Sequence, residues 1–244
     1  MRAFETEKTE VAEIDRSVYD IKDKVNAAFE VNSGLTAEIV EQISKEKHDP
    51  DWMREFRLKA LDIYNKASIP NWGPSLEGLD MRNIVTYVRP NTEMRGKWSE
   101  VPDDIKNTFE RLGIPQAERS SLAGVGAQYD SEVVYHNVKE EVAAQGVVYT
   151  DMESALTGPY ADMVKEHFMK CVPPTDHKFA ALHGAVWSGG SFVYVPAGVH
   201  VDIPLQSYFR LNAPGAGQFE HTLIIVDKGA YLHFIEGCSA PKYN

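Results

Sequence analysis

The sequence predicts an α+β protein in which a helical N-terminal region is followed by a β-rich region. Between residues 36 and 64 the apolar residues recur at helical spacing, whereas from about Gly126 their period approaches two. Glycine and proline turns then divide the segment from Phe179 to Pro241 into short apolar runs. Strands at this spacing fit a sandwich, a barrel or a β-solenoid, and no exact repeat selects among the three.

Three regions follow from this pattern. Residues 1–33 are rich in charge and poor in large apolar side chains, so we expect a charged mobile tail. Residues 34–126 are predicted to be a helical N-terminal region with an extended connection, and residues 127–244 to be the β-rich core. Because Asn244 falls where another strand is expected, we interpret the core as truncated at its C-terminal end.

The helices carry recognisable start and stop signals. Thr36 is a candidate N-cap for a first helix that ends near Lys47, and the Asp49-Pro50-Asp51 run starts a second helix. A third helix begins at Pro102 and ends at Gly113. The first two helices are expected to form a docked hairpin that acts as a structural cap rather than as a catalytic unit.

Short helices are also expected among the strands of the C-terminal half, at 139–144, 151–156 and 159–170. Apolar runs bounded by turn residues are expected to be strands. These runs are 131–137, 146–150, 179–187, 191–196, 197–212, 218–227 and 230–238.

Composition excludes several classes of protein. The formal net charge of −11 argues against a general nucleic-acid binder, which needs a basic surface. No run reaches 18 apolar residues and the charged start lacks an apolar signal core, so we expect no membrane span and a cytoplasmic location. In a reducing compartment the two cysteines are expected to be free thiols.

Cys238 is the first candidate functional residue. It follows a run in which Leu232, Phe234 and Glu236 alternate with residues of the opposite face, and Gly237 permits a bulge or a close approach. Such a thiol can accept sulfur or bind metal if its thiolate is stabilised. The alternative is a buried, inert cysteine. Cys171, before a proline pair, is a weaker candidate.

Two polar pairs are further candidates. His200 and Asp202 share one strand face, which suits a metal centre and resembles the glycine-turn-histidine element of cupins; the alternative is a surface pair at a turn. Arg210 and Asn212 also share a face in a segment poor in charge, so they must find partners, reach water or line a cavity. The chain has no phosphate-binding loop and is not expected to hydrolyse ATP.

Three motifs in the C-terminal third carry a family resemblance. They are Tyr-Phe-Arg-x-Asn at 208–212, Gly-Gln-Phe-Glu-x-Thr at 217–222 and Glu-Gly-Cys-Ser-Ala-Pro at 236–241. In this order and spacing they resemble the SufB family of iron–sulfur cluster assembly scaffold proteins. The stretches 51–60 and 109–115 resemble the same family, so the likeness runs from about Leu35 to Asn244.

The resemblance implies a right-handed β-helix preceded by a helical region. It implies a scaffold subunit, not itself an enzyme, in which Cys238 accepts sulfur for a nascent cluster while Arg210 and Asn212 line its path. The implied partners are a SufC-type ATPase, a SufD-type paralogue and a cysteine desulfurase or sulfur-transfer protein. The implied cofactors are a transient iron–sulfur cluster and a reduced flavin.

Family members are about twice as long as this chain, so we interpret it as an N-terminal half: a fragment, or one piece of a chain interrupted by an intein. The cluster ligands are then expected beyond residue 244. Two other functions stay open from the residues alone. One is a cupin-like metal-binding β protein that uses His200 and Asp202. The other is a purely structural β-solenoid module with an inert Cys238.

Overall fold

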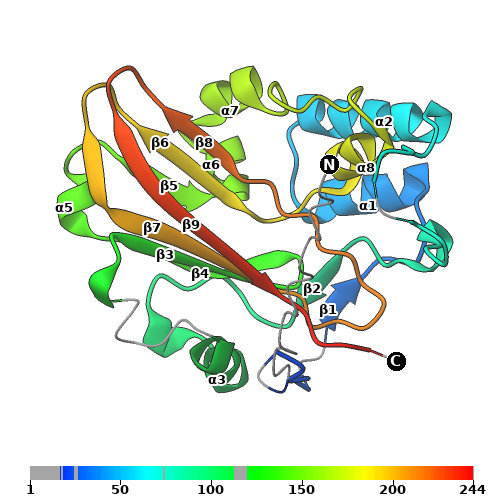
Figure 1. The fold of residues 1–244 in the computed structure, drawn as a ribbon, viewed down its shortest axis with the longest axis horizontal. Helices are drawn as coiled ribbons and strands as arrows, with labels where there is room; N and C mark the ends of the chain where they lie inside the picture. Colours follow the sequence, from blue (N-terminus) through cyan, green and yellow to red (C-terminus); the bar gives the residue numbers. More distant parts are fainter. Residues whose placement is uncertain (1–16, 18, 25–26, 74, 113–119, 244) are drawn as a thin grey trace, which may run out of the picture.

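The computed structural model describes residues 17, 19–24, 27–73, 75–112 and 120–243. Two facing sheets form the body of the molecule, and three helices cluster beside one end of them (Figure 1). This arrangement confirms the predicted mixture of helices and strands. The clustered helices are α1 (Ala37–Glu46), α2 (Asp51–Lys66) and α8 (Lys178–Val186).

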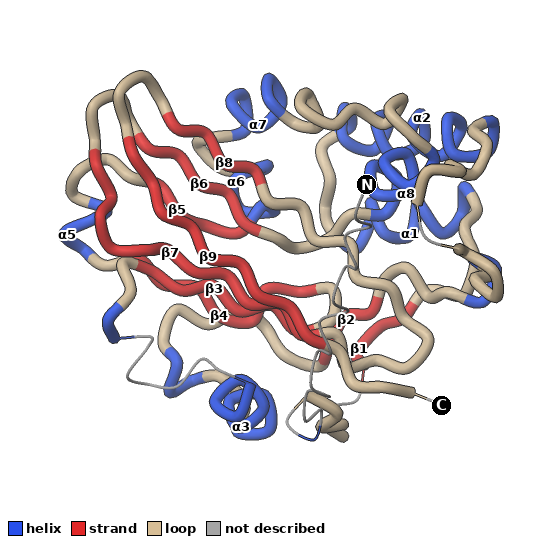
Figure 2. Tube along the Cα trace, in the orientation of Figure 1, coloured by secondary structure: helices blue, strands red, loops and turns tan. Residues whose placement is uncertain are grey.

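The larger sheet has the order β4-β3-β7-β9 and the smaller has the order β5-β6-β8 (Figure 2). The chain runs from β6 to β7 and then from β8 to β9, so successive strands alternate between the sheets. Both resulting pairs, β6–β8 and β7–β9, are parallel. The bounds are β3 Gly124–Tyr129, β4 Glu132–Val138, β5 Val148–Asp151, β6 Ser191–Val195, β7 His200–Arg210, β8 Leu223–Val226 and β9 Tyr231–Ser239.

Apolar side chains of both sheets meet between them. Val193 and Val195 of β6 pack with Val201 and Leu205 of β7, and Phe234 of β9 joins this cluster. The outer face of the larger sheet is covered by α3 (Asp103–Leu112), and α6 (Met152–Thr157) and α7 (Ala161–His167) pack against the smaller sheet. The remaining short elements are η2 Met81–Asn83, η3 Trp98–Glu100 and α5 Glu140–Ala143.

One predicted strand is wrong. The run 179–187 lies in helix α8, which begins after His177. The His177 Nδ1 accepts hydrogen bonds from the backbone N–H groups of Phe179 and Ala180, at 3.1 and 3.2 Å, and so caps the helix. A helix that is apolar on nearly every side has no helical period, so its pattern cannot be told from that of a buried strand.

Part of the segment expected to be a mobile tail is ordered as a strand. Strand β1 (Ala27–Glu30) pairs antiparallel with β2 (Val88–Pro90), which follows the extended connection. Residues 1–16, 18 and 25–26, which also belong to that expected tail, lie outside the described residues. The division of the chain into regions 1–33, 34–126 and 127–244 stays a prediction.

A buried ion cluster joins the helical region to the strands. Lys47, at the end of α1, has a side chain only 4% exposed, and its Nζ lies 2.9 Å from Glu132 Oε1 and 2.7 Å from Glu153 Oε1. Burial alone would lower the pKa of Lys47, but Glu153 and Glu132 outweigh that effect and raise it. The same Glu132 accepts a hydrogen bond from the hydroxyl of Tyr87.

We predict that Lys47→Met lowers the free energy of unfolding by about 3 kcal/mol, because both carboxylates then lose their shared cation. Urea denaturation of the purified chain measures this value. Lys66→Met is the matched control, since Lys66 pairs with Asp62 in solvent and such pairs contribute about 0.5 kcal/mol. An equal loss in both variants would contradict the structural role of the buried cluster.

Candidate functional site: a thiol on an edge strand

Cys238 lies near the end of β9, the edge strand of the larger sheet. It is a free, exposed thiol, paired in parallel register with Phe209 of β7. Gly237, beside it, lies against Tyr208: a Cβ at this position would come within 3.0 Å of the tyrosine ring. A close approach therefore does occur next to the thiol, and the thiol itself is exposed in this structure.

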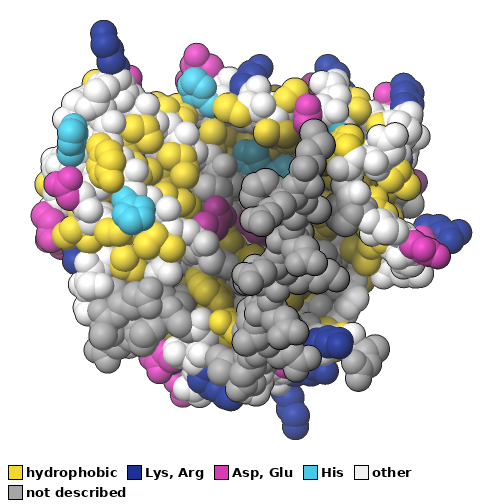
Figure 3. Space-filling model, viewed as in Figure 1, with side chains coloured by type: hydrophobic (Ala, Val, Ile, Leu, Met, Phe, Trp, Pro, Cys, Tyr) yellow, Lys and Arg dark blue, Asp and Glu magenta, His cyan; other side chains and the backbone are white. Residues whose placement is uncertain are grey.

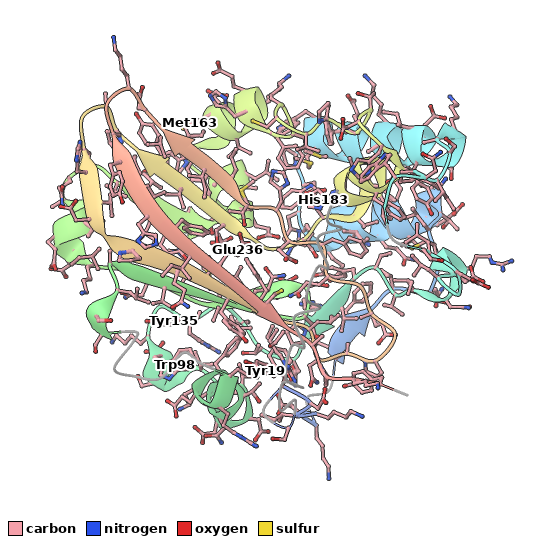
Figure 4. The ribbon with its side chains drawn as sticks, viewed as in Figure 1. Tyr19, Trp98, Tyr135, Met163, His183 and Glu236 are labelled. Atoms are coloured by element: carbon pink, nitrogen blue, oxygen red, sulfur yellow. The ribbon has the colours of Figure 1, made fainter. Side chains whose placement is uncertain are left out.

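Strand alternation places Cys238 on the same face of β9 as Phe234 and Glu236. Phe234 enters the core between the sheets. Glu236 accepts a hydrogen bond from Thr222 Oγ1 at 3.1 Å, and Figure 4 shows Glu236 near the middle of the molecule. The thiol is thus at the end of a row of side chains that changes from apolar to polar along the strand.

Glu220 adds a second carboxyl group near this row. Its Oε2 is buried and has no hydrogen-bond partner among the described residues. Burial, reinforced by the negative charge of Glu236, raises the pKa of the Glu220 carboxyl. No local pattern in the sequence indicates that Glu220 lies near β9, because this contact depends on the pairing of distant segments.

Arg210 and Asn212 lie on the other side of the sheet from Cys238. Arg210 pairs with Ser239 in the register, one position beyond the thiol, so its side chain points to the opposite face. The Arg210 guanidinium donates hydrogen bonds to the carbonyl oxygens of Tyr19 and Ile21, and to Ser239 Oγ at 3.2 Å. Figure 4 shows Tyr19 beside the C-terminal end of β9.

Asn212 holds the same N-terminal segment. Its Oδ1 accepts from the Asp23 backbone N–H at 3.0 Å, and its Nδ2 donates to the Asp23 carbonyl at 3.2 Å. The Asn212 backbone N–H in turn donates to Asp130 Oδ1 at 2.6 Å. The structure thus gives both residues specific partners, and a role in lining a path stays a prediction.

Asp130 is a residue of this site that sequence reasoning missed. It occupies the turn between β3 and β4 with a φ of 52°, and its carboxylate accepts from the N–H groups of Asn212 and Ala213. The available signal was an aspartate between two alternating runs, which is typical of a tight turn. That signal does not reveal which distant segment the carboxylate contacts.

The structure places His200 and Asp202 on the exposed part of β7. His200 Nε2 lies 3.2 Å from the Gly229 carbonyl oxygen. Among the described residues no three histidine, cysteine, aspartate or glutamate side chains are grouped so that they could hold a metal ion. The pair therefore has no third ligand in that part of the chain. Across the same residues, every helix is too short or too polar to span a membrane.

Comparison with known proteins identifies the class. The family model described as the SufBD protein N-terminal region matches residues 37–207. The iron–sulfur cluster assembly protein SufB of Bacillus subtilis is 54% identical over 225 residues, which are 92% of this chain and 48% of that protein. A SufBD family iron–sulfur cluster assembly protein of Mycobacterium tuberculosis is 49% identical over 234 residues, which are 96% of this chain and 28% of that protein.

The chain therefore belongs to the SufBD family, the family of iron–sulfur cluster assembly proteins that includes SufB. It spans about half the length of the Bacillus subtilis relative. The resemblance found in the three C-terminal motifs is confirmed.

We predict that Arg210→Met loosens the segment 19–24, because the Tyr19 and Ile21 carbonyls lose a charged donor. Losing such a bond costs about 1.5 kcal/mol, so hydrogen exchange in a peptide covering this segment should accelerate roughly tenfold. Arg82→Met is the control, since Arg82 is exposed and pairs locally with Asp80. Unchanged exchange in Arg210→Met would show that the segment is held by other contacts.

A second prediction concerns the pH dependence of stability. Because the folded-state pKa of Glu220 is raised, its ionisation destabilises the fold as pH rises through that pKa. Glu220→Gln should therefore melt at a higher temperature than the parent chain at about pH 8, and at the same temperature at about pH 4. Scanning calorimetry at both values measures the difference. The exposed Glu77→Gln should show no difference, and an equal gain at both values would refute the assignment.

Proposed function

We propose that this chain is part of a scaffold subunit for iron–sulfur cluster assembly and that Cys238 is its sulfur acceptor. The observation that carries the proposal is the state and position of the thiol: free, exposed and near the end of β9, in the motif that the sequence shares with the SufB family. Because the thiol is exposed in this structure, a protein donor can reach it without rearrangement of the strands.

The transfer is a thiol–persulfide exchange. The Cys238 thiolate attacks the terminal sulfur of a donor persulfide, and a bond forms between that sulfur and Cys238 Sγ. The donor's own sulfur–sulfur bond breaks, and its thiolate leaves with the electron pair. The sulfur oxidation state is conserved, so the step requires no external oxidant or reductant.

The proposal also includes the sulfur donor and the partner proteins that the family resemblance implies. The donor is a cysteine desulfurase or a sulfur-transfer protein, and the assembly includes a SufC-type ATPase and a SufD-type paralogue in the cytoplasm. The alternating parallel pairs β6–β8 and β7–β9 support a β-helix, because each pair adds one strand to each of two facing sheets. The cluster is the product of this assembly, and no residue of this chain is assigned to a reduced flavin.

We predict that a cysteine desulfurase supplied with L-cysteine places one additional sulfur on the Cys238 peptide, and that Cys238→Ser abolishes this labelling. Mass spectrometry under non-reducing conditions maps the modified peptide. His233→Gln is the matched control, because His233 is exposed on the opposite face of the same strand. Persulfide found mainly on the Cys171 peptide, or full labelling of Cys238→Ser, would refute Cys238 as the acceptor.

A further inference from the structure

The segment 19–24 lies beside the end of β9, on the side of the larger sheet that faces α3. Figure 1 shows it in dark blue below the C-terminal end of β9, and Figure 3 shows lysine and arginine side chains along that lower edge. Ile21 and Asp23 are partly buried, whereas Lys22 and Lys24 are exposed. We call residues 19–24 the strap, because they connect elements that are far apart in the sequence.

Two buried residues at the end of β7 hold the backbone of the strap. Arg210 has no exposed surface, and its guanidinium donates to the carbonyl oxygens of Tyr19 and Ile21. Asn212 is 4% exposed, and its side-chain amide both donates to and accepts from the Asp23 backbone. These bonds use backbone atoms of the strap, so they fix its path along the sheet.

The side chain of Asp23 provides a further anchor. Its Oδ2 accepts hydrogen bonds from Thr108 Oγ1 of α3 at 2.6 Å and from the Tyr129 hydroxyl of β3 at 2.8 Å. Both donors are almost completely buried, and hydrogen bonds to a charged acceptor are about twice as strong as neutral ones. The strap is thus bound to the helix that covers the sheet as well as to the sheet itself.

The strap also holds the residues that follow Cys238. The pairing of β7 with β9 ends at Ser239, one residue after the thiol. Ser239 Oγ accepts a hydrogen bond from Arg210 at 3.2 Å, and the Lys242 backbone N–H donates to Asp20 Oδ1 at 2.9 Å. The strap is therefore in contact with the chain on the C-terminal side of the thiol.

This position matters because the end of a strand opens more readily than its centre, where more hydrogen bonds must break. Cys238 is one position from the end of its ladder, so its orientation depends on what holds the next residues. Transfer between two proteins requires the thiolate to lie close to the donor sulfur, and a misplacement of about 1 Å can slow such a step roughly a hundredfold.

We propose that the strap is a positioning element for Cys238. By binding Lys242 directly, and Ser239 through Arg210, it keeps the end of β9 closed and the thiol in the orientation that a protein donor requires. This inference rests on the proposed function, since it assigns residues to the same sulfur transfer. Asp20 acts through the backbone that follows β9 and is a positioning residue.

Single-turnover sulfur transfer to the purified chain, from a cysteine desulfurase supplied with L-cysteine, tests the proposal over a range of desulfurase concentrations. In Asp20→Ala the rate of persulfide formation on Cys238 at saturating desulfurase should fall roughly tenfold, because Lys242 loses its acceptor. The half-saturating concentration should not change, since the strap fixes geometry and not affinity. Asp20→Asn should restore the rate, because its side-chain carbonyl can accept the same bond.

A second pair of variants acts from outside β9. Thr108→Val keeps the shape of the side chain but removes its bond to Asp23, and it should slow transfer at saturation about threefold. Thr108→Ser keeps the hydroxyl and should transfer at the parent rate. Asp62→Ala is the control, since it removes an exposed aspartate that pairs with Lys66. Circular dichroism establishes that each variant is folded.

Alkylation by iodoacetamide separates positioning from a change in the thiol itself. This small reagent needs no docked orientation, so Cys238 should be alkylated at least as fast in Asp20→Ala as in the parent. Cys171 is the reference thiol. It is exposed and lies on the wall of a cavity that the strap does not line, together with His183 and His221, whose facing nitrogens are 2.8 Å apart.

Full-rate transfer in either Asp20→Ala or Thr108→Val overturns the positioning role. An equal loss in Asp20→Asn, or slower alkylation of Cys238 in Asp20→Ala, overturns it as well. Failure of the proposed function looks different, because the parent chain would then take up no sulfur on Cys238, and the positioning role would fall with it. Labelling of the parent with no effect of the variants refutes the role of the strap alone.

Discussion

The packing of the helical cluster against the strands depends on one buried cation shared by two carboxylates. Lys47 ends α1, Glu132 begins β4 and Glu153 lies in α6, so three elements far apart in sequence meet at one ammonium group. Glu153 also accepts a hydrogen bond from the Gly189 backbone N–H at 2.6 Å. A charge so well enclosed is stable only with both partners in place, which fixes the helical cluster relative to the connection between α8 and β6.

The parallel pairing of β7 with β9 then separates two kinds of chemistry. Successive residues of a strand point to opposite faces, so Cys238 and Arg210 are neighbours in the sheet yet face different surroundings. On one face of the larger sheet, Arg210 forms hydrogen bonds to the N-terminal segment at Tyr19 and Ile21. On the opposite face, Cys238 follows Glu236, whose negative charge acts on the nearby Glu220 carboxyl. Cys238 is exposed on its face of the sheet, whereas Arg210 on the opposite face is held by hydrogen bonds to Tyr19 and Ser239.

The two free thiols of the chain lie in different surroundings. Cys238 lies on a sheet edge beside carboxyl groups, and Cys171 lies at a cavity with a neutral histidine pair. Cys238 is the thiol for which we propose persulfide exchange, because it is exposed and lies in the motif shared with the SufB family.

Local signals in the sequence determined the helices α1, α2 and α3 and most of the strands. The motifs around Arg210, Glu220 and Cys238 indicated the SufBD family, to which the similarity over most of the chain assigns it. Caps and periodicity act within a few residues, so the chain itself contains that information. Only the tertiary structure decided that 179–187 is a helix, that Lys47 meets Glu132 and Glu153, and that His183 meets His221. The contacts of Lys47 and His183 join residues up to about a hundred positions apart in the sequence. For the segment 179–187, whose residues are nearly all apolar, the tertiary packing decides between a helix and a strand, and no local pattern in the sequence indicates that packing.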